Sequence, residues 1–191
     1  MKLFLILAPF GAFATLVLTG LAVVGLFVAG AICLLTILYD LRHGRSIKML
    51  ALGSAVIFIT LGSYLTLAPA ALSDSAVKLA VDLGVLAIAL VSLALRTPFT
   101  LQYAREMTDS ETVRMPGFLA ANYVITWVWA LAFLLMALSN VLMLYVPDLP
   151  LWAGIAIVFI ARNIAMWFSR WYPEYRKAKL AGPPPAAPSA A

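Results

Sequence analysis

The chain has 191 residues, of which 64% are hydrophobic and only 11% are charged. A soluble domain needs more polar side chains to cover its surface, so this composition excludes that class and indicates a protein whose solvent is mostly lipid. The formal net charge of +5 comes from basic residues scattered among short loops, which favours a role in membrane topology over nucleic-acid binding. The single cysteine, Cys33, excludes an intrachain disulfide, and the single histidine, His43, excludes a bis-histidine haem within one chain. We therefore expect no cofactor, no metal and no nucleic-acid partner.

The first apolar stretch, residues 3–39, is longer than one membrane span needs. Its opening is similar to a secretory signal, but the apolar run continues far beyond the small residues at which such a signal would be cleaved. We predict that residues 1–10, interrupted by Pro9, form a short N-terminal interfacial segment and that residues 15–39 form the first full span. A second arrangement, in which two short spans turn near Thr19-Gly20, stays open.

Four further apolar segments are each long enough to cross a bilayer, and each is bounded by charged residues, proline or both. They cover residues 47–67, 76–95, 119–142 and 151–168. The predicted fold class is an all-α integral membrane protein with about five transmembrane helices. We expect a polytopic membrane domain over residues 1–180 and a disordered Pro/Ala tail over residues 181–191, because the tail has no residues that could pack.

The loop over residues 97–116 has a local pattern of its own. Phe99, Tyr103 and Met107 recur every four residues, opposite a polar side, and Pro98 suits the first position of a helix. This pattern predicts a short amphipathic helix on the cytoplasmic interface. A docking surface, a gate and a simple connection between two spans are all compatible with it.

The orientation in the membrane follows from the basic residues, because cytoplasmic loops keep an excess of Lys and Arg. Ten of the 13 Lys and Arg residues lie in three segments, 42–48, 96–114 and 170–179, which fall on one side if there are five spans. The opposite loops contain Asp74 and Asp148. We therefore expect a cytoplasmic C-terminus and a periplasmic N-terminus.

Tryptophans mark the ends of the predicted spans. Trp152 near the outer end of the last span, with Trp167 and Trp171 near its inner end, is typical of the aromatic belts at both membrane interfaces. For Trp127 and Trp129, the pattern fits both a belt position and packing between helices.

Asp82 and Arg162 lie inside predicted spans, where an ionised side chain costs about 2.5 kcal/mol or more. They are therefore the first candidates for a functional role. Asp82 has Lys78 one turn away on its own span and Asn140 at a similar depth on another. Asp82 and Arg162 are expected to lie too far apart to pair directly.

Arg162 has different candidate partners. Asn163 follows it directly, and Asn122 and Thr126 enter the same half of the membrane. A long side chain can either reach the interface or make a forked contact with such groups, and we favour the forked contact. Structural hydrogen bonds between helices are the alternative to a role in transport for all of these residues.

No motif of a known catalytic chemistry is present. The sequence contains no G-x-S-x-G, H-E-x-x-H, Walker or dinucleotide-binding pattern. Arg105 and Glu106 are adjacent, so they cannot face each other on a helix as a catalytic pair. We expect no enzymatic activity; an intramembrane enzyme that acts on lipid is a third hypothesis without a supporting motif.

An ordered set of residues along positions 1–175 is similar to one known family. It includes Pro9, Tyr39, Arg42, Lys48, Trp129 and Asn140. In this set the chain resembles the intracellular septation protein A family of bacterial inner-membrane-spanning proteins. The resemblance implies a non-enzymatic role in cell-envelope integrity and septation, through membrane-embedded contacts with division or elongation proteins. The alternative is a small channel or transporter that uses Asp82 or Arg162, and self-association is compatible with either.

Overall fold

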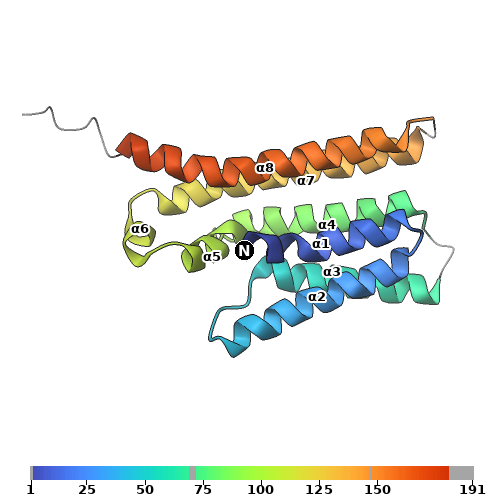
Figure 1. The fold of residues 1–191 in the computed structure, drawn as a ribbon, viewed down its shortest axis with the longest axis horizontal. Helices are drawn as coiled ribbons and strands as arrows, with labels where there is room; N and C mark the ends of the chain where they lie inside the picture. The colour runs from blue at the N-terminus through green and yellow to red at the C-terminus, as the bar shows by residue number, and fades with distance from the viewer. Residues whose placement is uncertain (1, 69–71, 147, 181–191) are drawn as a thin grey trace, which may run out of the picture.

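The computed structural model describes residues 2–68, 72–146 and 148–180. Within these residues the chain forms eight helices, five of which are long and apolar enough to cross a membrane (Figure 1). The five are α2 (Ala22–Arg42), α3 (Met49–Leu67), α4 (Asp74–Ala94), α7 (Phe118–Tyr145) and α8 (Leu151–Leu180). The others are the shorter apolar α1 (Lys2–Leu18) and the connecting helices α5 (Phe99–Met107) and α6 (Ser110–Arg114). The predicted fold class is confirmed, whereas the predicted tail lies outside the described residues.

The predicted first span, residues 15–39, is wrong because a turn divides it. Gly20 has a φ of 78°, a left-handed conformation that glycine adopts without strain. The N–H of Leu21 donates to the carbonyl of Leu16 at 2.9 Å, a bond typical of a helix C-terminus. α1 therefore ends and α2 begins at the turn that the second arrangement placed near Thr19-Gly20.

α1 is part of the helical bundle and not a separate interfacial segment. Pro9, the expected interruption, lies inside α1, as prolines do in membrane helices whose neighbours compensate for the missing hydrogen bond. Phe10 and Phe13 contact the fully buried Phe58 of α3, with ring centroids 5.6 and 5.5 Å apart. The aromatic contact fixes α1 against α3 along its inner face.

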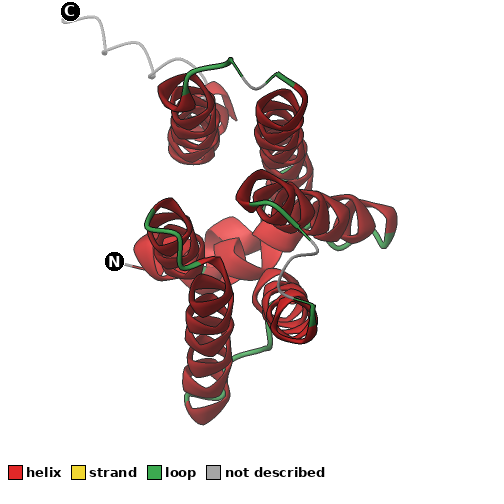
Figure 2. Ribbon diagram, turned by 90° about the vertical axis from the view of Figure 1, so that its right-hand side faces the viewer, coloured by secondary structure: helices red, strands yellow, loops and turns green. Residues whose placement is uncertain are grey.

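The long helices pack in the order α1, α2, α3, α4, α7 and α8, each against the next. At the contact between α3 and α4, each helix places a glycine opposite an isoleucine of the other. A Cβ at Gly84 would lie 2.6 Å from Ile57 Cδ1, and a Cβ at Gly53 would lie 2.5 Å from Ile88 Cδ1. Glycines of this kind let membrane helices approach closely. Figure 2 shows the bundle from the end at which α7 turns into α8.

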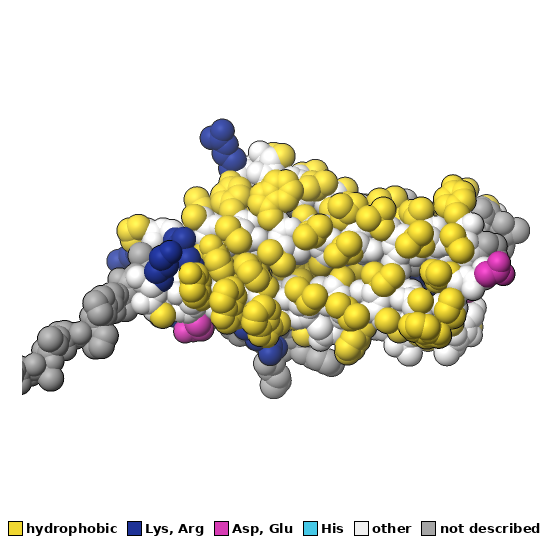
Figure 3. Space-filling model, turned by 90° about the horizontal axis from the view of Figure 1, so that it is seen from above, with side chains coloured by type: hydrophobic (Ala, Val, Ile, Leu, Met, Phe, Trp, Pro, Cys, Tyr) yellow, Lys and Arg dark blue, Asp and Glu magenta, His cyan; other side chains and the backbone are white. Residues whose placement is uncertain are grey.

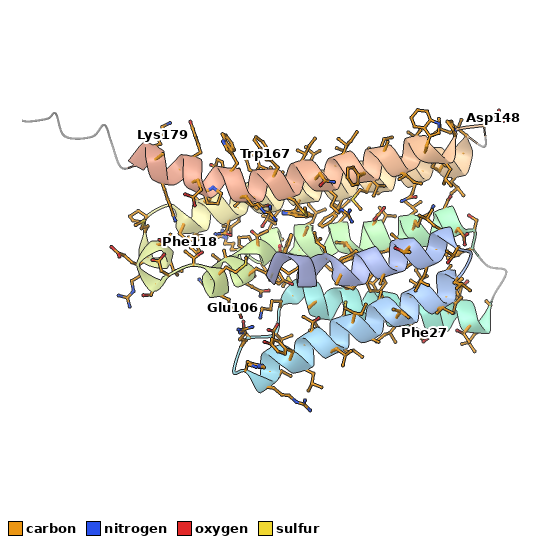
Figure 4. All side chains as sticks on the ribbon, viewed as in Figure 1. Phe27, Glu106, Phe118, Asp148, Trp167 and Lys179 are labelled. Atoms are coloured by element: carbon orange, nitrogen blue, oxygen red, sulfur yellow. The ribbon has the colours of Figure 1, made fainter. Side chains whose placement is uncertain are left out.

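The basic segments lie together at one end of the bundle, which we call the basic end. It contains the turn between α2 and α3, the helices α5 and α6, and the C-terminal part of α8 (Figure 1). In Figure 4 the side chains of Glu106 and Lys179 lie at this end, and Asp148 lies at the opposite end. Apolar side chains cover the middle of the face shown in Figure 3. This distribution suits a bundle that crosses a membrane along its long axis.

Both ends of the described chain lie at the basic end. Ile6, near the start of α1, lines a small cavity together with Arg45 and Lys48, and α8 ends on the same side (Figure 1). The two ends of the described chain therefore lie on one side of the bundle, whereas the sequence placed the N-terminus and the C-terminus on opposite sides of the membrane. The physical reason is α1, which adds one pass along the bundle that the predicted single span did not contain.

The predicted loop helix is present, but as two helices. α5 begins at Phe99, whose N–H donates to Ser92 Oγ at 3.1 Å. α6 begins after Asp109, because the N–H of Thr112 donates to Asp109 Oδ1 at 2.8 Å and caps a new helix. Phe99 is buried and α5 packs against α7, so this segment covers the basic end of the bundle.

Candidate functional site

A lateral groove runs along the bundle between α1 and α8, the two helices at the ends of the packing order. α4 and α7 form its floor, and α5 and α6 contribute its wall at the basic end. Its volume is about 620 Å³, within the range of about 300–1,000 Å³ that is usual for ligand sites. Most of the wall is apolar, and Ile155 and Phe159 of α8 are 45% and 58% exposed in it. The groove is therefore open along its side, at the level of the membrane.

Asp82 and Asn140 form a hydrogen-bonded pair in the floor of the groove. Asn140 Nδ2 donates to Asp82 Oδ2 at 2.7 Å, and both residues are buried. The close packing of α4 against α7 brings them together, as the similar depth of the two residues in the sequence predicted. Lys78, one turn from Asp82, lines the same groove.

Arg162 also lines the groove, from α8. Its Nε is buried and has no hydrogen-bond partner among the described residues. The structure shows no ion pair between Arg162 and Asp82, in agreement with the expectation that the two lie too far apart. A cationic side chain thus faces an apolar groove with one donor unused.

The forked contact favoured for Arg162 is wrong, because the structure shows no hydrogen bond from its guanidinium to Asn122, Asn163 or Thr126. Asn163 Nδ2 donates to the Phe159 carbonyl of its own helix at 2.7 Å, and Asn122 Nδ2 donates to the Phe118 carbonyl at 2.9 Å. The hydroxyls of Thr126 and Thr100 bond each other at 2.7 Å. Asn122 still lines the groove, closer to the basic end, but its amide group is already engaged with its own backbone.

At the basic end the groove opens between α6 and the C-terminal part of α8. Asp109, Arg176 and Lys177 line this mouth. The N–H and the hydroxyl of Thr112 both donate to Asp109, and these bonds hold the pKa of that carboxyl below its ordinary value. Lys177 lies 3.8 Å from Glu174 in an exposed pair. Arg176 is half-buried in the mouth.

Trp129 joins α7 to α8 at the groove. It is 6% exposed, and its indole N–H donates to Ser169 Oγ at 2.9 Å. Trp127, by contrast, is 57% exposed. Of the two positions compatible with the sequence, Trp129 therefore takes the one between helices, and Trp127 points outward.

A buried ion cluster at the basic end was missed in the sequence. Lys48 is 3% exposed, and its Nζ lies 2.8 Å from Asp40 Oδ2 and 2.7 Å from Glu106 Oε1. Arg45 adds longer contacts to the same two carboxylates, at 3.7 and 4.0 Å. Burial, with the nearby carboxylates, raises the pKa of Tyr103 well above its ordinary value, so its hydroxyl stays protonated. The cluster ties α5 to the turn between α2 and α3.

The other residues of the resemblance lie around this cluster. Pro9 and Tyr39 line a cavity of about 70 Å³ together with Lys48. The Tyr39 ring lies 4.1 Å from the ring of His43, measured between centroids. Arg42 is exposed, as a residue that only sets topology would be.

Comparisons with protein-family models, curated proteins and solved structures found no match to this chain. Among the described residues no group of three or more His, Cys, Asp or Glu side chains could hold a metal ion. The groove offers an apolar wall, a hydrogen-bonded acid–amide pair and cations near one mouth, an arrangement suited to binding an amphipathic molecule.

Proposed function

We propose that the protein is a non-enzymatic bacterial inner-membrane protein that supports cell-envelope integrity and septation through membrane-embedded contacts. The observation that carries the proposal is the lateral groove of about 620 Å³, open along its side. Trp129 and Asn140, two residues of the resemblance to the intracellular septation protein A family, line this groove. The cellular role comes from that resemblance, and the groove supplies a place where a membrane component can be held.

In this proposal the basic end faces the cytoplasm, because Lys and Arg are retained on that side. Both termini are then cytoplasmic, and the loops that contain Asp74 and Asp148 are periplasmic. Division or elongation proteins, the partners implied by the resemblance, contact the outward face of α8 beside the groove. Ile160 and Ile164, each 56% exposed, lie on that face.

Filling the groove tests this function. Ala14 is exposed on the groove wall, so Ala14→Trp should occupy part of the space without disturbing the buried core. Ala31→Trp adds the same bulk to an exposed position of α2 that does not line the groove and serves as the control. In a strain that lacks the protein and has an envelope or septation defect, Ala31→Trp should rescue growth and Ala14→Trp should not. Equal rescue by both variants at matched abundance would reject the groove as the working site.

A second function, a small channel or transporter, is favoured by one observation. Asp82, a carboxyl buried in the floor of the groove, pairs with Asn140 and has Lys78 one turn away on the same helix. An asparagine at position 82 keeps the volume and can still accept a hydrogen bond from Asn140, but it cannot carry a proton.

We expect Asp82→Asn to leave abundance and rescue nearly unchanged, because the non-enzymatic function needs only the hydrogen bond. The measurement is ion flux in liposomes that contain the purified wild-type protein or the variant, tested against a panel of ions. A flux that the wild-type protein supports and Asp82→Asn abolishes would favour transport over the first proposal.

A further inference from the structure

The unused donor of Arg162 identifies the part of the groove that lacks a partner. Its Nε is buried without a hydrogen bond among the described residues, and the structure shows no hydrogen bond from its guanidinium to the nearby Asn122 or Asn163. A cation in an apolar environment is costly unless an acceptor compensates it. Within a membrane, the acceptor available from the side of an open groove is the headgroup of a lipid.

Arg162 lies within reach of lipid headgroups at the basic end. Trp167, 59% exposed on α8 (Figure 4), stands at the level of the predicted inner aromatic belt. Five residues separate it from Arg162, which corresponds to about 7.5 Å of helix. The arginine stem can span much of this distance by extending toward the interface. A phosphate therefore needs to sink only slightly into the groove to meet the guanidinium.

The opposite wall of the groove favours the same position. α1 has 17 residues, about 25 Å of helix, whereas the hydrocarbon core of a bilayer is about 30 Å thick. A short apolar helix is matched by local thinning of the bilayer, which lowers the headgroups beside it. α1 and α8 thus act together to bring a headgroup toward Arg162.

The charges at the mouth select the class of lipid. Arg176 and Lys177 line the groove on the cytoplasmic side of Arg162, and the acidic groups there are Asp109, bonded to Thr112, and the largely exposed Glu174. Lys177 pairs with Glu174, whereas Arg162 and Arg176 have no ion pair among the described residues. This excess of positive charge complements a headgroup that is negative overall.

We propose that the groove between α1 and α8 binds one anionic phospholipid from the leaflet at the basic end. Its phosphate accepts hydrogen bonds from Arg162, its headgroup faces Arg176, and an acyl chain lies against Phe159 and the aromatic floor. This inference rests on the proposed function, in which the groove is the working site, and names the chemistry of the molecule that it holds.

The test uses the full-length protein in nanodiscs that contain equal amounts of phosphatidylglycerol and phosphatidylcholine. A photo-crosslinking amino acid replaces either Phe159, which lines the groove, or Ile164, which is exposed on the same helix outside the groove. Mass spectrometry then gives the ratio of anionic to zwitterionic adducts. We expect a ratio of about ten or more at position 159, because both lipids carry a phosphate but phosphatidylcholine adds a choline cation that the excess positive charge of the groove disfavours, and a ratio near one at position 164.

Variants of α8 assign the preference to its cause. Arg162→Leu should lower the ratio at position 159 several-fold without abolishing it, because Arg176 and Lys177 stay at the mouth. Arg162→Lys, which keeps the charge but loses the forked donor, should give a smaller decrease. Arg170→Leu removes an exposed basic residue outside the groove and should leave the ratio unchanged. Leucine suits a membrane helix, and the tryptophan fluorescence of each variant checks that it is folded.

Four outcomes would overturn the inference. One is a ratio near one at position 159 in the wild-type protein, and another is an unchanged ratio in a folded Arg162→Leu variant. The third is competition by excess inorganic phosphate, which would assign the site to a free anion instead of a lipid headgroup. Capture of a protein at position 159 in native membranes, with rescue still abolished by Ala14→Trp, would reject the lipid while leaving the groove as the working site.

Discussion

Replacing Lys48 with methionine tests how firmly the basic end is held. The Nζ atom of Lys48 lies within 2.8 Å of Asp40 and of Glu106, and the side chain is 3% exposed. At an effective dielectric constant of about 20, each contact corresponds to about 6 kcal/mol of Coulomb energy, most of which offsets the desolvation of the charges. Removal of one partner of a buried ion pair costs about 3–5 kcal/mol. We expect about 3 kcal/mol, the lower value, because Glu106 is 23% exposed and can turn toward water.

The matched control is Arg45→Met. Arg45 is 32% exposed and lies 3.7 and 4.0 Å from the same carboxylates, so its loss should cost about 1 kcal/mol or less, as for exposed ion pairs. Unfolding of both variants in detergent micelles, followed by tryptophan fluorescence, gives the free energies. Equal losses for Lys48→Met and Arg45→Met, or a loss below 1 kcal/mol for Lys48→Met, would refute the buried cluster as a stabilising feature.

A double variant assigns the effect to the contact itself. In Lys48→Met with Glu106→Gln, the carboxylate that loses its contact with Lys48 is also removed. We expect the double variant to lose less free energy of unfolding than the sum of the losses of the two single variants, by at least about 1 kcal/mol, since residues in one ion network are coupled. Hydrogen exchange should locate the loss in α5, which Gln102 also holds by accepting the Met49 N–H at 2.7 Å.

Two further predictions concern topology and packing. Reporter fusions after Lys48, Arg105 and Lys179 should give a cytoplasmic signal, and fusions after Asp74 and Asp148 a periplasmic one. A fusion after Gly20 should also give a periplasmic signal, and a cytoplasmic signal there would mean that α1 does not cross the membrane. Gly84→Val should lower the free energy of unfolding by about 1–3 kcal/mol, because the valine side chain would overlap Ile57. Gly11→Ala should change it little, since the added Cβ meets no atom within 4 Å. Similar losses for both variants would reject close packing of α3 against α4.

Most of the spans could be predicted because charge or proline bounds them. The segment predicted over residues 47–67 corresponds to α3, and the last segment begins at Leu151 as predicted. The first 39 residues offered no such boundary, since apolar residues lie on both sides of the turn. Pro9 suggested a break that the helix does not have, and Gly20 marked the real one. In an apolar run, a left-handed glycine and a tolerated proline are difficult to distinguish by composition.

The sequence predicted how deep the candidate residues lie in the membrane but not the direction in which their side chains point. Asp82 and Asn140 meet because equal depth on adjacent helices was enough. Arg162 does not bond Asn122 or Asn163. Asn163 is its neighbour in sequence and points to another side of the same helix, and a similar depth in the membrane does not decide which way a side chain on another helix points. Lys48 was interpreted as a loop charge, since its partner Glu106 is 58 residues away in the sequence.

The ion cluster and the groove are connected through α5. Tyr103 and Met107 of α5 line both the groove and the small cavity beside Lys48, although Lys48 itself does not line the groove. Any movement of α5 away from the turn between α2 and α3 would therefore change the wall of the groove at the end where the lipid headgroup is proposed to enter. The shape of the groove would then depend on both groups of family-resembling residues: Pro9 and Tyr39 at the small cavity, and Trp129 and Asn140 in the groove itself.

This connection makes a prediction that a purely local cluster would not. Lys48→Met should lower the ratio of anionic to zwitterionic adducts at position 159 several-fold, even though the lysine lies outside the groove, because α5 loses its attachment. Arg45→Met, which removes a basic residue of the same turn but leaves the contact between Lys48 and Glu106, should not change it. If hydrogen exchange shows α5 loosened in Lys48→Met while the adduct ratio stays at its wild-type value, the wall formed by α5 does not determine what the groove binds.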